Sequence, residues 1–145
     1  MKFSLNPATE SALYLTRTFN VPKDKVKKAW LEAGALQKWW GPAASLDWKP
    51  KLGNTFRFDY PVTTGEKSAV VGEFRDVSDD MLVLSWVGEG GKKALGGTLV
   101  TVEFRKVPQG TELALTHELL PTGAARDAQR AEWLGRLERL GQSLA

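Results

Sequence analysis

Residues 98–119 read TLVTVEFRKVPQGTELALTHEL and hold two stretches in which apolar and polar side chains alternate. The residues on the apolar faces are Val100, Val102 and Phe104 before the turn, and Leu113, Leu115, His117 and Leu119 after it. Pro108-Gln109-Gly110 between them is typical of a tight turn. The stretch therefore predicts an antiparallel hairpin with one apolar face.

The same period of two recurs through the preceding half of the chain. It predicts strands over residues 12–19, 54–60 and 68–77. Residues 81–87 are predicted to be a strand that is apolar on both faces, and residues 45–48 are a short strand candidate. Turn residues separate the later strands: Thr64-Gly65, Ser78-Asp79-Asp80 and the glycine-rich residues 88–97. Consecutive strands with short connections favour an antiparallel meander.

Apolar residues recur at helical spacing in three other places. A first helix is predicted to begin at Pro22 and to be ended by Gly34, and a second, over residues 35–40, is stopped by Gly41-Pro42. The third, over residues 124–144, has an apolar stripe of Trp133, Leu137, Leu140 and Leu144. Charged residues, Arg136 and Arg139 among them, fill the rest of that helix.

This order of elements predicts an α+β fold in a single domain over residues 1–145, with a curved antiparallel sheet and a long C-terminal helix. A sheet with one apolar face must cover that face, and the last helix is the only predicted element long enough to do so. A strongly bent sheet around one helix is expected to leave a space between them, open near the two short helices.

Composition excludes several classes of protein. The chain has 145 residues, 42% of them hydrophobic, and no cysteine, so disulfides and thiolate chemistry are excluded. The net charge of +3 is small. The cluster Lys23, Lys25, Lys27 and Lys28 is interpreted as a solvated helix face, so no nucleic-acid partner is expected. No apolar run is long enough for a membrane span.

The N-terminal residues 1–11 are expected to be a loose lead-in without a signal peptide, which makes a cytoplasmic location the expectation. Nothing in the sequence indicates an oligomeric state.

No catalytic constellation is visible. His117 is the only histidine, no metal-ligand spacing surrounds it, and no Gly-x-Ser-x-Gly motif is present. Composition alone leaves a Ser-His-Asp arrangement open through Ser45, Ser68 or Ser85. We therefore predict no cofactor and no metal. His117 lies on an apolar strand face, either as a partly buried histidine with one partner or as a polar anchor in an apolar cavity.

The adjacent tryptophans of LQKWWGP, Trp39 and Trp40, point about 100° apart on a helix. One of them can anchor the short helix to the sheet, which is worth roughly 1.5–3 kcal/mol. The other is then expected to face a cavity entrance or solvent; plain core packing of both is the alternative.

Four segments resemble the SRPBCC (START-like, helix-grip) superfamily, and within it the group related to the C-terminal domain of the activator of heat-shock protein 90 ATPase. They are TRTFNVPKDKVKKAW, LQKWWGP, VTVEFRKVPQGTELALTHE and AEWLGRLERL, which span residues 12–144 in family order. Where the family often has Gly-Gly, this chain has Gly53-Asn54.

The resemblance implies binding of a small hydrophobic or amphipathic molecule in a cavity between the sheet and the last helix. The candidate lining residues are Trp39, Trp40, Phe56, Phe58, Phe74, Trp86, Phe104, His117 and Trp133, with Arg57 or Tyr60 as further polar groups. Two alternatives remain: a chaperone-associated module with a role in stress response, and an enzyme of the cyclase or hydratase type.

Overall fold

The structure is a computed structural model that describes residues 11–62, 65–91 and 94–145. Its elements in chain order are β1 (Leu13–Phe19), α2 (Lys23–Leu31), α3 (Ala33–Trp40), β2 (Ser45–Asp47), β3 (Thr55–Asp59), β4 (Ala69–Val77), β5 (Met81–Glu89), β6 (Leu95–Val107), β7 (Gly110–Glu118) and α4 (Gly123–Leu144). The lead-in predicted for residues 1–11 lies outside the described residues, apart from Ser11.

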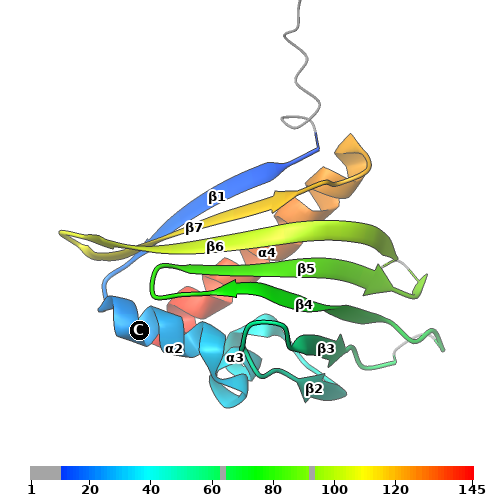
Figure 1. Cartoon of the computed structure of the whole chain (residues 1–145), viewed down its shortest axis with the longest axis horizontal. Helices are drawn as coiled ribbons and strands as arrows, with labels where there is room; N and C mark the ends of the chain where they lie inside the picture. Colours follow the sequence, from blue (N-terminus) through cyan, green and yellow to red (C-terminus); the bar gives the residue numbers. More distant parts are fainter. Residues whose placement is uncertain (1–10, 63–64, 92–93) are drawn as a thin grey trace, which may run out of the picture.

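All seven strands form one antiparallel sheet in the order β1-β7-β6-β5-β4-β3-β2. Strands β2 to β7 follow one another as a meander, and β1 closes the far side by pairing with β7. In Figure 1, α4 crosses one face of this curved sheet, α3 lies near β2 and β3, and α2 lies at the end of the sheet where β4 turns into β5. The predicted fold class and the order of elements are confirmed.

The hairpin of residues 98–119 forms as predicted, with Phe104 opposite Leu113 and Val107 opposite Gly110. Strand β6 begins earlier than predicted, at Leu95, because it continues to pair with β5 as far as Gly88. Strand β7 ends at Glu118, and Leu119 has a φ of 66° and is 63% exposed. Leu119 therefore does not extend the apolar face.

The prediction that Gly34 ends the first helix was wrong. Helix α2 ends at Leu31, and Gly34 lies inside α3. The break falls at Glu32, whose φ of −105° and ψ of 126° are extended. The backbone N–H of Glu32 still donates to Lys28 O and its carbonyl accepts from Leu36 N, so one residue separates the two helices without leaving these groups unpaired.

The lysine cluster of α2 is only partly a solvated face. Lys23 is 9% exposed and pairs with Asp79, at 3.0 Å, and with Asp80, while Lys27 pairs with Asp79 at 2.8 Å. These lysine contacts lower the pKa of Asp79 to about 2. The pairs attach α2 to the turn between β4 and β5.

Strand β4 lies very close to β5 at Gly72. A Cβ at this position would lie 1.9 Å from Ser85 O and 2.7 Å from the Phe56 ring. Only glycine fits without a shift of the backbone.

No helix among the described residues is both long enough and apolar enough to cross a bilayer.

Candidate functional site

Tryptophan rings from every layer of the fold meet between the sheet and α4. Trp40, at the end of α3, is central: its ring centroid lies 5.4 Å from that of Trp86 on β5 and 5.7 Å from that of Trp133 on α4. We call the tryptophan and phenylalanine rings that contact Trp40, either directly or through Trp48, the aromatic cluster. Its members are Trp30, Trp39, Trp40, Trp48, Phe56, Phe58, Phe74, Trp86 and Trp133.

Both adjacent tryptophans are buried. Trp39 is 0% exposed and Trp40 is 2% exposed. Trp39 Nε1 donates to Ala29 O at 2.9 Å, which attaches α3 to α2. The expectation that one of the two faces an entrance or solvent was wrong, because α4 covers the side of α3 that sheet packing alone would leave open.

Arg139 holds the C-terminal end of α3 against α4. Its Nε donates to Trp39 O at 2.9 Å and its Nη2 donates to Trp40 O at 3.0 Å. Gly41, with a φ of 124°, and Pro42 prevent the helix from continuing, so these carbonyl groups have no helical partner. A cation at a helix C-terminus also interacts favourably with the helix dipole.

Arg136 lies inside the aromatic cluster and is only 3% exposed. Its guanidinium carbon is 4.7 Å from the ring centroids of Trp40 and Trp133 and 5.4 Å from that of Trp86. Its Nη2 donates to the Tyr60 hydroxyl at 3.1 Å. The expectation that Arg136 lies on the polar face of the helix was wrong. Arg136 follows Trp133 by three residues and precedes Leu140 by four, and this spacing indicates that it lies on the apolar stripe.

His117 is fully buried and has two partners. Trp133 Nε1 donates to His117 Nδ1 at 3.1 Å, because an indole nitrogen can only donate. Thr98 Oγ1 lies 2.8 Å from His117 Nε2 and donates to Trp86 O at 2.8 Å. The imidazole is therefore neutral with its proton on Nε2, which it donates to Thr98.

Burial and, to a smaller extent, the nearby Arg136 charge lower the pKa of His117 to about 3. With both nitrogens occupied, His117 holds no hydrogen bond to Ser45, Ser68 or Ser85. Its two hydrogen bonds join β7 to β6 and α4.

The remaining candidates divide into two groups. Phe56, Phe58 and Phe74 join the aromatic cluster. Phe104 is equally buried, but no ring contact among the described residues connects it to the cluster. It instead lines a surface pocket with Lys23, Asp79 and Asp80 near the start of β5, whereas Trp86 lies near the end of that strand.

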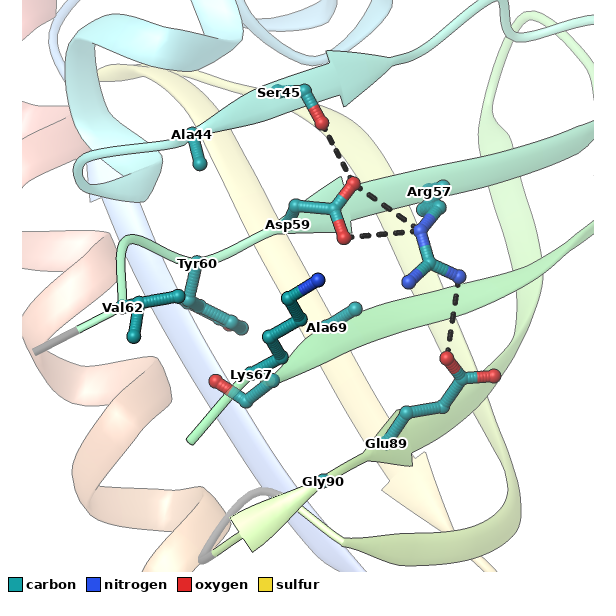
Figure 2. A pocket seen from close by; sticks show the side chains of 11 residues that line it. Ala44, Ser45, Arg57, Asp59, Tyr60, Val62, Lys67, Ala69, Glu89 and Gly90 are labelled. Carbon is teal, nitrogen blue, oxygen red and sulfur yellow. Dashed lines mark hydrogen bonds and ion pairs between the residues drawn. The ribbon is translucent and has the colours of Figure 1, made fainter. Parts of the chain in front are cut away.

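A pocket of about 360 Å³ opens at the β2–β5 edge of the sheet (Figure 2). Asp59 accepts from Ser45 Oγ at 2.7 Å and from Arg57 Nε at 3.0 Å, and Arg57 Nη1 pairs with Glu89 at 3.2 Å. The hydrogen bond from Ser45 and the Arg57 guanidinium lower the pKa of Asp59. Arg57 thus lies in an exposed ion-pair network and not inside the aromatic cluster.

Tyr60 connects this pocket with the aromatic cluster. It lines the pocket, its ring centroid is 4.9 Å from that of Phe58, and its hydroxyl accepts the hydrogen bond from Arg136. Of the two further polar groups expected from the sequence, Tyr60 therefore reaches the interior and Arg57 does not.

Comparison with known proteins agrees with this geometry. Residues 20–145 match the family model described as Activator of Hsp90 ATPase homolog 1-like protein, and the chain belongs to that family. Its fold is the helix-grip fold of the SRPBCC superfamily, which commonly binds hydrophobic ligands. No curated protein matches the sequence.

Solved structures share the fold at low sequence identity. An uncharacterised protein from Rhizobium leguminosarum superposes with a TM-score of 0.83 at 22% identity, covering 92% of this chain and 93% of that one. A Rhodobacter sphaeroides protein gives 0.80 at 23%, covering 96% and 95%. A Staphylococcus aureus protein of unknown function gives 0.79 at 13%, covering 92% of each chain.

Proposed function

We propose that this protein binds a small apolar or amphipathic molecule between the concave face of the sheet and α4. The lining consists of Trp39, Trp40, Phe56, Phe58, Phe74, Trp86, His117 and Trp133, to which the aromatic cluster adds Trp30 and Trp48. Flat, rigid rings offer a ligand a large contact area at a small cost in conformational entropy. Phe104 stays outside this lining.

The observation that carries the proposal is that Tyr60 contacts both the pocket at the β2–β5 edge, which we call the edge pocket, and the aromatic cluster. The same side chain lines the edge pocket and hydrogen-bonds to Arg136 inside the aromatic cluster. The pocket volume of about 360 Å³ is within the range of small-molecule sites. We therefore assign the edge pocket as the entrance and Tyr60 as the residue that separates it from the interior.

Binding requires the rings to move, because each residue of the lining is at most 4% exposed. Helix α3 has only eight residues, and Gly41 and Pro42 follow it directly. A ligand that displaces Tyr60 and separates the Trp40 ring from Phe58 replaces ring–ring contacts with ring–ligand contacts. The open site is thus a minor conformation of the free protein, and the ligand stabilises it.

Two matched phenylalanine variants test the location of the site. Phe58 belongs to the aromatic cluster and Phe104 does not, although both are buried on the same face of the sheet. We expect Phe58→Leu to weaken binding of the neutral fluorescent probe N-phenyl-1-naphthylamine about fivefold or more, which corresponds to about 1 kcal/mol. Phe104→Leu should leave the dissociation constant unchanged.

Urea unfolding of both variants provides the control, since each change costs a similar amount of packing. Equal loss of affinity in the two variants would contradict the assigned location. A lack of saturable probe binding to the unaltered protein would reject the proposed function itself.

Association with a chaperone is a second candidate function, and the family description favours it. The test is to titrate this protein into heat-shock protein 90 and to measure ATP turnover. A saturable increase would support the interaction, and an unchanged rate at high concentration would remove it.

A further inference from the structure

Four buried side-chain nitrogen atoms in and around the aromatic cluster have no hydrogen-bond partner among the described residues. They are Arg136 Nε and Nη1, Trp30 Nε1 and Trp40 Nε1. All four can donate a hydrogen bond and none can accept one. The only other unpaired buried side-chain atom in the described part of the chain is Gln129 Oε1, about two turns earlier on α4. The unpaired groups of the cluster therefore require an acceptor.

The Arg136 charge also has only a loosely placed counter-ion among the described residues, and no carboxylate hydrogen-bonds to it. The nearest carboxylate oxygen, Glu132 Oε2, is 4.0 Å from Nη2, which is beyond hydrogen-bonding distance, and the Glu132 side chain is 44% exposed. Burial lowers the pKa of Arg136, yet a guanidinium remains protonated in proteins. Arg139, on the same helix, adds a second positive charge and is occupied by the carbonyl groups of α3.

Contacts with ring faces offset only part of this cost. A ring face attracts the cation electrostatically. It does not replace the hydrogen bonds that the N–H groups of a buried charge lose when they leave water. Neutral His117 supplies no negative charge, and the Tyr60 hydroxyl occupies only Nη2. Burying the Arg136 charge without enough acceptors destabilises the protein, and a ligand that supplies an acceptor would remove this destabilisation.

We propose that the ligand of this site is a small organic carboxylate with an apolar body, and that its carboxylate accepts hydrogen bonds from Arg136. This inference rests on the proposed function and names its ligand class. Nε–H and Nη1–H offer the carboxylate oxygens unoccupied donors on the guanidinium, and charge-assisted bonds of this kind are about twice as strong as neutral ones. The apolar body lies among the rings of Trp40, Trp86 and Trp133.

The edge pocket suits the entry of an anion. Lys67 extends into it beside Tyr60 (Figure 2), while Asp59 and Glu89 are engaged by Arg57. A carboxylate that passes Tyr60 reaches Arg136 directly, because these two side chains are hydrogen-bonded to each other.

Titration calorimetry with matched ligands tests the proposal. The probes are 4-phenylbutanoate and 4-phenylbutan-1-ol, and octanoate and octan-1-ol, which differ within each pair in the acid group. We expect each acid to bind the unaltered protein at least tenfold more tightly than its alcohol. Arg136→Met should remove this preference and leave alcohol binding within about threefold.

Arg130→Met is the matched control, since Arg130 is exposed on the same helix. It should retain the preference for the acid. The melting temperature of Arg136→Met without ligand should be maintained or raised, because a buried unpaired charge is removed. This result would also show that the variant folds.

The outcomes separate the two proposals. Equal binding of acid and alcohol, or a preference that persists in Arg136→Met, would overturn the carboxylate inference and leave the proposed function standing. No binding of any of the four probes, together with no binding of N-phenyl-1-naphthylamine, would overturn both.

Discussion

At the scale of single residues, His117 shows how burial sets a protonation state. Both of its ring nitrogens are engaged and its pKa is about 3, compared with 6.5 for an ordinary histidine. Between these two values the unfolded chain binds a proton that the folded protein excludes. Stability must therefore fall as the pH drops below about 6.5.

This leads to a prediction for the pH range between 6.5 and 5, where few carboxyl groups titrate and the chain has no cysteine. The free energy of unfolding should fall with a slope that is about 0.7 kcal/mol per pH unit at pH 6.5 and approaches about 1.4 kcal/mol per pH unit at pH 5. In His117→Gln, which lacks the only histidine, the profile should be nearly flat. Urea unfolding at pH 7, 6 and 5 measures both slopes, and parallel slopes would contradict the assignment.

Arg136 is the residue that sequence analysis could least place. Arginine is usually found at the surface, and its long side chain can reach solvent from many positions on a helix. The helical spacing that connects it to Trp133 and Leu140 was readable. Whether the side chain turns toward those residues depends on the space that the rings of Trp40 and Trp86 leave open.

At the scale of elements, Gly72 allows β4 to lie very close to β5. A methyl group there would meet Ser85 O at 1.9 Å, and a backbone oxygen cannot rotate away as a side chain can. The interior position of Gly72 in a strand was visible from the sequence, but the partner it approaches was not.

We predict that Gly72→Ala destabilises the protein by roughly 1–3 kcal/mol or more, the usual range for overpacking. Gly96→Ala on β6 is the matched control, because a Cβ there would have no atom within 4 Å. Thermal unfolding compares the two variants. Equal melting temperatures would show that β4 can shift away from Ser85 at little cost.

At the scale of the whole molecule, α3 and α4 close one side of the aromatic cluster and the sheet closes the other. A ligand that enters there must disturb the α3–α4 contact. The hairpin between β6 and β7 is held by strand pairing at a distance from the edge pocket. The two regions should therefore respond differently to a ligand.

We predict that saturating N-phenyl-1-naphthylamine changes amide hydrogen exchange in residues 33–40, near Tyr60 and in residues 133–140. Exchange in residues 104–113 of the β6–β7 hairpin should stay unchanged. Exchange mass spectrometry with and without the probe measures this difference. A change confined to the hairpin, or spread evenly over the chain, would place the probe elsewhere.

The order of elements, the meander and most strand faces could be predicted from the sequence. These depend on local periodicity, which side-chain alternation and turn residues encode directly. The sequence also indicated most members of the aromatic cluster, because Phe56, Phe58, Phe74, Trp86 and Trp133 lie on the apolar faces of their elements.

How far along a face each residue lies, and which side chains it contacts there, follows from the packing of the elements against one another. This packing separated Phe104 from the aromatic cluster, buried both Trp39 and Trp40, and placed Arg136 among the rings. Periodicity assigns a residue to a face of one element. The surroundings of Arg136 arise where α3, α4 and the sheet converge, and contacts between segments so distant in the chain leave no periodic pattern in the sequence.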